Sequence, residues 1–166
     1  IDADLILFVN NCSNARVYAV YPEVINTKNE TVPASPYVAG VIAKSDNNNG
    51  FWCSPSNKII NGIIGLSKPV DFSLGDSSCR ANYLNEHNVA TIINQDGYRL
   101  WGNRSTINEG SYKFLCVRRT ADIISDSILQ AHLWAVDRNI VKNYLTDVTE
   151  SVNAFLANLK SQGAIL

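Results

Sequence analysis

The segment TVPASPYVAGVIA, residues 31–43, decides how the rest of the chain is interpreted. Ser35 and Pro36 together predict the start of a helix. Serine is a favoured N-cap, and proline at the first helical position gives up an N–H that has no partner there in any case. Ala39 and Gly40 follow, and their small side chains would let another backbone approach closely. The segment therefore predicts a tightly packed helix that begins at Ser35 and Pro36.

The same segment resembles the helix that carries the nucleophilic serine of subtilisin-like proteases, whose pattern is G-T-S-M-A-x-P-H-V-A-G. In that pattern the serine stands four residues before the proline. Counting back from Pro36 gives Val32, and the histidine after the proline is replaced by Tyr37. Valine has no hydroxyl or thiol to deprotonate, so acyl transfer has no nucleophile. Ser35 lies at the wrong offset and is needed as the helix cap, so we expect no enzyme activity.

A general base is equally hard to find in this sequence. Its two histidines, His87 and His132, both follow position 32, whereas the aspartate and histidine of subtilases precede the serine. We interpret His87 as a residue at a helix end and His132 as a packed helix residue. A divergent hydrolase that uses Cys53 or Ser54 stays open as the alternative hypothesis.

Composition and charge exclude several classes of protein. The chain has 166 residues, 46% of them hydrophobic and 17% charged, with a net charge of −1, which is typical of a globular protein with a core. The longest basic run is the pair Arg118 and Arg119, so the sequence lacks the stripe of basic residues that nucleic-acid binding requires. The apolar runs are too short to span a membrane, and the sequence contains no phosphate-binding, dinucleotide or zinc motif. We therefore expect no nucleic-acid partner, no membrane insertion, no cofactor and no metal.

The cysteines indicate the redox state of the protein, and the absence of methionine bears on whether the chain is complete. Cys12, Cys53, Cys79 and Cys116 lie far apart without a C-x-x-C pair, which favours reduced, buried thiols over a zinc site or a disulfide framework. The sequence contains no methionine, so we expect the chain to be a piece of a longer protein.

Apolar periodicity and turn residues predict the remaining elements. We expect strands at residues 5–9, 16–24, 90–93, 98–101 and 113–117, the last three as an antiparallel meander. We expect a polar turn at residues 26–30 and a loop at 46–50. Helices are predicted at residues 77–88, from an N-cap at Thr120, and along the apolar stripe of 141–159, with Gly163 as its C-terminal signal.

Several ordered blocks of the chain resemble the tail sheath proteins of contractile phages and related bacteriocins, most of all the P2-like and pyocin-like sheaths. The blocks are PASPYVAGVIAKSD (33–46), GFW (50–52) with SPSN (54–57), LNEHNVATI (84–92), GYRLWGNRST (97–106), FLCVRRTADIISDSI (114–128) and LWAVDRN (133–139). This resemblance covers the chain from about residue 17 to its end.

The resemblance implies an α/β (α+β) fold, the remnant of a subtilisin-like α/β region packed on a smaller mixed sheet with flanking helices. It implies a non-catalytic end of the subtilisin-like sheath region at residues 1–57. Residues 58–166 would then be the sheath C-terminal α/β region, truncated before the linking arm. The implied role is a structural subunit that assembles helically with other sheath subunits around the tail tube protein. Contraction would drive the tube through the host envelope.

The resemblance also implies a location in the virion, after assembly in the host cytoplasm. A sheath-like subunit of a secretion or bacteriocin injection machine is the alternative that the sequence leaves open. Family members continue past the last helix into a linking arm. We therefore expect these 166 residues alone to stay monomeric or weakly associated.

Four residues in the matched blocks are candidates for polar scaffolding or subunit contacts. These are Trp101, Arg104, Arg118 and Arg119. Trp101 also fits a core aromatic residue, and an arginine at the end of an element also fits local pairing. Arg104, which follows a glycine in an expected loop, is the first choice for a functional arginine.

Overall fold

The computed structural model describes residues 2–137 and 139–166, and it confirms a mixed α/β architecture. The chain divides into two compact units, Ile1–Arg118 and Arg119–Leu166, which are described separately. All strands of the described chain belong to the first unit, and the second consists of helices. Among the described residues, no helix is both long enough and apolar enough to cross a membrane.

A four-stranded sheet forms the centre of the first unit. Its strand order is β1 (Ala19–Tyr21), β6 (Val89–Asn94), β7 (Tyr98–Trp101) and β4 (Lys58–Ile59). β1 is parallel to β6, and the other two pairs are antiparallel. Asp96 and Gly97 join β6 to β7 with positive φ angles of 50° and 100°, which suits a tight hairpin. The strands predicted at 90–93 and 98–101 are thus confirmed.

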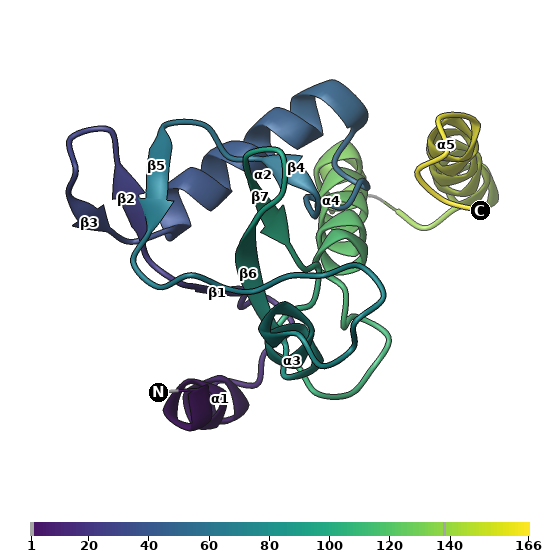
Figure 1. Ribbon diagram of the computed structural model, residues 1–166. Coiled ribbons are helices and arrows are strands. Elements are labelled where there is room, and N and C mark those ends of the chain that lie inside the picture. Colours follow the sequence, from purple (N-terminus) through teal and green to yellow (C-terminus); the bar gives the residue numbers. More distant parts are fainter. Residues whose placement is uncertain (1, 138) are drawn as a thin grey trace. The chain divides into compact units, whose positions relative to one another are not determined.

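The central strand β6 is buried on both faces because helices cover each side of it. Ala90 and Ile92 belong to a core cluster with Val38 and Val41 of α2 (Ser35–Asn49). Val89 and Ile93 point the other way, into a second cluster with α1 (Asp2–Asn11) and α3 (Arg80–Glu86). Figure 1 shows α2 running past the strands of both sheets.

A second, three-stranded sheet has the order β3 (Thr31–Val32), β2 (Val24–Asn26) and β5 (Ile63–Leu66), all antiparallel. The polar turn before β3 is confirmed, because Oδ1 of Asn26 accepts hydrogen bonds from the backbone N–H groups of Lys28 and Glu30. The single strand predicted at 16–24 is wrong. β1 ends before Pro22, which has no N–H for a ladder, and β2 begins in the other sheet.

Three local predictions near the first two helices are wrong. Residues 5–9 lie in helix α1 rather than in a strand, since a short apolar run fits either structure. Ser35 is the first residue of α2, whereas the N-cap position is held by Ala34 without a side-chain hydrogen bond. Residues 46–49 continue α2 instead of forming a loop, and Gly50, with φ 93°, ends it.

The fourth helix begins earlier than the sequence indicates. α4 (Leu115–Ala131) takes up most of the segment predicted as a strand at 113–117, and Thr120 lies inside it rather than at its N-cap. Only Phe114 keeps a strand-like contact, an isolated bridge to Arg104. The shorter helix α3 confirms the centre of the helix predicted at 77–88.

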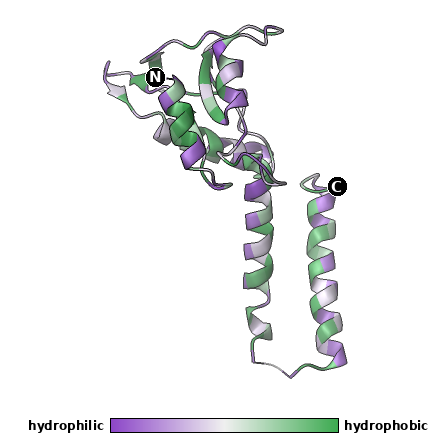
Figure 2. Cartoon of the chain, turned by 90° about the horizontal axis from the view of Figure 1, so that it is seen from below, coloured by the Kyte–Doolittle hydropathy of each residue, from purple (hydrophilic) through white to green (hydrophobic). Residues whose placement is uncertain are grey.

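The last helices follow the predicted stripe. A 3₁₀ turn, η1 (Leu133–Ala135), precedes α5 (Lys142–Ser161). Gly163, with φ 76°, ends α5 in a Schellman motif, because its N–H bonds to the carbonyl of Lys160 and the N–H of Ala164 bonds to that of Leu159. The C-terminal signal at Gly163 is therefore confirmed. Figure 2 shows hydrophobic segments recurring along α5, the helix next to label C.

Candidate functional site

The position at which a subtilisin-like enzyme carries its nucleophile is held here by Val32, which packs against the core. Val32 lies in β3, opposite Val24 of β2, and packs against the first core cluster. It presents only hydrocarbon, so nothing at this position can attack a carbonyl.

The alternative nucleophiles are engaged in local hydrogen bonds. The Cys53 thiol donates to the carbonyl of Asn49, and Oγ of Ser54 accepts from the N–H of Ser56. The two histidines bond within their own helical segments, His87 to the carbonyl of Tyr83 and His132 to that of Ile128. Over the residues that the structure describes, 2–137 and 139–166, neither imidazole is hydrogen-bonded to Cys53 or Ser54, so the geometry gives the hydrolase hypothesis no support.

Residues 101–106 form a polar segment that is hydrogen-bonded to several distant parts of the first unit, and two of the four candidate residues belong to it. Gly102 is central. Its N–H donates to Oγ of Ser56 at 3.0 Å, and its carbonyl accepts from the Tyr18 hydroxyl at 2.8 Å. Its φ of 134° favours glycine, and a Cβ there would clash with Oδ1 of Asn85 and lie 3.0 Å from Cα of Ala90.

Trp101 and Arg104 line one pocket of about 210 Å³, beside α3. Trp101 ends β7 and packs edge-on against Phe72, with ring centroids 4.7 Å apart. Nη1 of Arg104 donates to the carbonyl of Asn85 at 3.4 Å. Glu86 lines the same pocket, so the site combines an aromatic face, a guanidinium and a carboxylate.

Asn103 connects this segment to the start of α4. Its backbone carbonyl accepts from the N–H of Leu115 at 2.8 Å, and its side-chain Oδ1 accepts from the N–H of Cys116 at 3.4 Å. Its Nδ2 donates to Sγ of Cys116. Asn103 thus satisfies helix N–H groups in the manner of an N-cap, although it lies outside the helix.

Ser105 and Thr106 are buried residues whose importance the sequence analysis missed. Oγ1 of Thr106 donates to the carbonyl of Cys12 at 2.8 Å or that of Asn14 at 3.1 Å, and accepts from the N–H of Asn14. Ser105 bonds to the carbonyl of Lys113 through both its N–H and its hydroxyl. Both residues stand at the end of the matched block at 97–106, and that match was the one sign of their importance in the sequence. The sequence could not reveal their hydrogen-bond partners, because these lie elsewhere in the chain.

Arg118 and Arg119 do not line the pocket of Trp101 and Arg104. Both are half-buried residues of α4. The guanidinium of Arg118 stacks over the ring of Tyr112, with Cζ 4.3 Å from the centroid. Arg119 begins the second unit. A role of any of the four residues in subunit contacts stays a prediction.

Burial controls the ionisation of the tyrosine that anchors Gly102. Desolvation raises the pKa of Tyr18 well above its usual range, so this hydroxyl stays protonated and remains a donor. Within residues 2–137 and 139–166, no group of three or more His, Cys, Asp or Glu side chains is placed to hold a metal ion. The segment at 101–106 is therefore a hydrogen-bonding hub in which Arg104 carries the one charged side chain.

The chain is similar to known protein families along nearly its whole length. Residues 7–106 match the family model described as the phage tail sheath protein central domain, and residues 108–166 match the phage tail sheath C-terminal domain. The chain belongs to the phage tail sheath family. Curated relatives of this sheath chain include a protein described as a prophage major tail sheath protein of Pseudomonas aeruginosa (strain UCBPP-PA14). It is 47% identical over 170 residues, covering 99% of this chain and 44% of the relative.

Other sheath proteins match over similar ranges. The tail sheath protein of Escherichia phage P2 is 32% identical, over 94% of this chain and 41% of the relative. Among solved structures, the helical sheath of the anti-feeding prophage in its contracted state matches with a TM-score of 0.80 and 26% identity, over 91% of this chain and 42% of that one. The sheath chain thus spans less than half the length of these relatives.

Proposed function

We propose that this chain is the central and C-terminal part of a structural subunit of a contractile tail sheath. In the full-length protein, subunits would assemble helically around a tail tube, and contraction would drive the tube through the host envelope. The partners would be other sheath subunits and the tube protein, with assembly in the host cytoplasm and a final place in the virion. The tandem match to two sheath domains along nearly the whole chain carries this proposal.

The proposal extends to the division of the chain. Residues 1–57 would be the end of a subtilisin-like sheath region that has no catalytic role. Residues 58–166 would be the sheath C-terminal α/β region, which takes in the last part of the central-domain match as well as the C-terminal match at 108–166. Val32 at the nucleophile position supports a non-catalytic role. β1 and β6, one from each part, pair in a single sheet, so the two parts would share a core.

Exposed apolar surface in the second unit supports a role in assembly. Leu129 and Leu133 are each 73% exposed, and Val136, Ile140 and Leu145 are exposed as well. Several large apolar side chains left exposed within one short segment are typical of interaction sites, because water solvates them poorly. A homopolymeric sheath would cover such surface with neighbouring subunits.

A sheath-like subunit of an injection machine is the second candidate. It is favoured by the match to the anti-feeding prophage baseplate structure, with a TM-score of 0.82 and 25% identity. The Trp101 and Arg104 pocket and the α4 arginines, Arg118 and Arg119, remain the candidate contact residues under either proposal.

Negative-stain electron microscopy of the full-length parent protein tests the assembly role. Striated tubes or rods are expected, and co-expression with the tube protein should order them further. Dispersed monomers at every salt concentration, together with labelling by a serine- or cysteine-directed activity probe, would contradict the proposal. A Cys53→Ala, Ser54→Ala double variant is the control for that labelling.

A further inference from the structure

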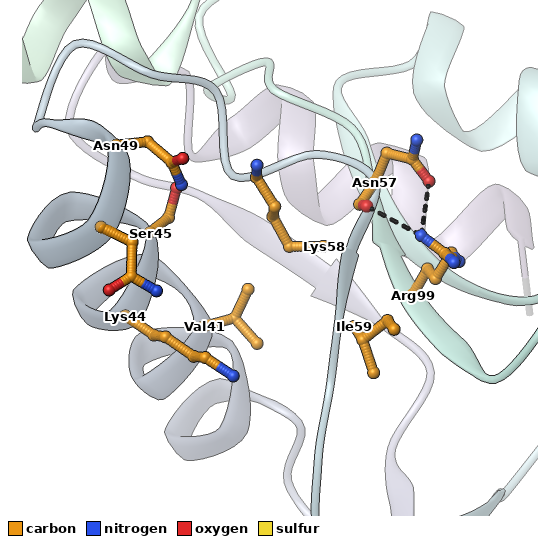
Figure 3. Close-up of a pocket in the computed structure, with 9 residues that line it drawn as sticks. Val41, Lys44, Ser45, Asn49, Asn57, Lys58, Ile59 and Arg99 are labelled. Carbon is orange, nitrogen blue, oxygen red and sulfur yellow. Dashed lines mark hydrogen bonds between the residues drawn. The ribbon is translucent and has the colours of Figure 1, made fainter.

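A pocket of about 290 Å³ lies between the C-terminal half of α2 and the edge strand β4, apart from the hub at residues 101–106 (Figure 3). The α2 residues that line it, Val41, Ser45 and Asn49 among them, recur every four positions and so share one face of the helix. The last turn of α2, residues 46–49, was predicted as a loop, and it supplies Asn48 and Asn49 to the pocket. The helix therefore continues past the core to form one wall of this pocket.

The pocket carries an excess of positive charge. Lys44, Lys58 and Arg99 line it, and none of the nine described residues around it is acidic. Nε of Arg99 donates to the carbonyl of Gln95, and Nη1 to the carbonyl of Asn57 at 3.3 Å, so neutral groups hold the guanidinium in place. The carbonyls at the C-terminal end of α2 contribute only about half a negative charge. Three cations outweigh that charge, so the pocket favours an anion.

Ser45 provides a second, independent observation. It is only 4% exposed and lines the pocket, yet its Oγ has no hydrogen-bond partner within the described part of the chain. A serine inside a helix commonly bonds back to the carbonyl four residues earlier, and a buried polar group left without a partner is destabilising. A ligand oxygen in the pocket would accept the hydrogen bond that this hydroxyl can donate.

We propose that this pocket binds a carboxylate carried on a short aliphatic stem. The lysine ammonium groups and the Ser45 hydroxyl would hold the carboxylate oxygens, and Val41 and Ile59 would contact the stem. Two sources offer this chemistry: a free dicarboxylic acid, or a glutamate side chain of another polypeptide. The proposal does not depend on the sheath role.

Titration of the ¹⁵N-labelled 166-residue chain, followed by amide NMR shifts, tests the proposal. The probes are glutarate, the peptide acetyl-Gly-Glu-Gly-amide, its neutral Gln counterpart and inorganic phosphate. Saturable shifts centred on Ser45, Asn49 and Lys58 are expected with carboxylates. Tighter binding of the Glu peptide than of glutarate would identify a polypeptide source, and binding of glutarate alone a free acid. Equal shifts with the Gln peptide, or tighter binding of phosphate, would overturn the proposal.

Variants separate binding from general electrostatics. Lys58→Gln should weaken carboxylate binding about tenfold, because a charge-assisted hydrogen bond is lost. Lys28→Gln removes the same charge from the turn before β3, and it should leave binding unchanged. Ser45→Ala should weaken binding severalfold while the thermal midpoint holds or rises, since the hydroxyl has no partner to lose. Equal effects of the two lysine variants, or unaltered binding by Ser45→Ala, would refute the site.

Discussion

Gly102 is the residue on which the hub at residues 101–106 depends. Replacing it with alanine places a methyl group 3.0 Å from the backbone Cα of Ala90, at a φ that side chains rarely adopt. We expect Gly102→Ala to lower the free energy of unfolding by about 2 kcal/mol or more, because strain and overpacking add. Urea denaturation followed by circular dichroism measures this.

Gly40 is the matched control for that substitution. It lies inside α2, and a Cβ there would meet nothing within 4 Å. Gly40→Ala should therefore stabilise the chain by about 0.5–1 kcal/mol. If both alanine variants shift the urea midpoint in the same direction, the role assigned to Gly102 is wrong.

Asp2 and Arg80 form an ion pair that makes stability depend on pH. Nη2 of Arg80 lies 2.6 Å from Oδ1 of Asp2, and this hydrogen bond lowers the pKa of Asp2 below its usual value. A lowered folded-state pKa means that the stabilisation is present above the unfolded pKa of about 4 and is lost as the pH falls through the folded pKa. The side chains are 33% and 28% exposed, so solvent screens the pair.

Asp2→Asn tests this dependence. At pH 7 we expect the variant to be less stable by up to about 1 kcal/mol, and the difference should vanish in acid below both pKa values. Thermal unfolding between pH 2 and pH 7 gives the measurement. A difference that persists unchanged at the acid end would show that Asp2 acts through packing instead.

At the scale of single elements, α4 shows how a distant residue can decide where a helix begins. Asn103 accepts hydrogen bonds from the N–H groups of Leu115 and Cys116. Asn103→Ala removes the side-chain acceptor of the Cys116 N–H, so it should cost about 1 kcal/mol and speed hydrogen exchange at Cys116. Asn153→Ala, in the exposed middle of α5, is the control and should leave both unchanged or slightly improved. Unaltered exchange at Cys116 would contradict the capping role of the side chain, whereas the Leu115 N–H keeps its bond to the backbone carbonyl of position 103.

Elements that nearby residues encode were predictable from the sequence, and elements that depend on a distant residue, such as the start of α4, were not. The stripe of α5 and the hairpin between β6 and β7 are encoded by nearby residues, so periodicity and the Asp96–Gly97 turn were enough to predict them. The start of α4 depends on Asn103, a partner outside the helix that no local pattern reveals. Thr120 looked like an N-cap only because that partner was unknown.

The candidate site divides in the same way. The match of the block at 97–106 pointed to Trp101 and Arg104, which share a pocket. It did not reveal the roles of Ser105 and Thr106, because their partners lie elsewhere in the chain. The pocket beside α2 was hidden for another reason: its asparagine-rich wall has the composition of a loop.

At the scale of the whole molecule, the exposed leucines of the second unit should matter for assembly and not for folding. Leu129→Gln with Leu133→Gln, in the full-length parent, removes apolar surface that is already solvated in the free chain. We expect tube formation to weaken severalfold, with an unchanged thermal midpoint of the unassembled subunit. Leu74→Gln, at a residue 79% exposed in the first unit, is the control. Unchanged assembly of the double variant, or an equal loss in the control, would contradict the assignment.

The hydrogen bonds of Thr106 also bear on how fast the fold is gained and lost. They join residues 94 and 92 positions apart, whereas Asn103 and Cys116 are 13 apart. Closing the longer loop costs about 2 kcal/mol more chain entropy, so these contacts should form late in folding. Thr106→Val should therefore speed unfolding severalfold in stopped-flow experiments and barely alter the refolding rate. A slowed refolding limb would instead place Thr106 in the folding nucleus. Thr106, which joins the two ends of the first unit, would thus slow the unfolding of that unit.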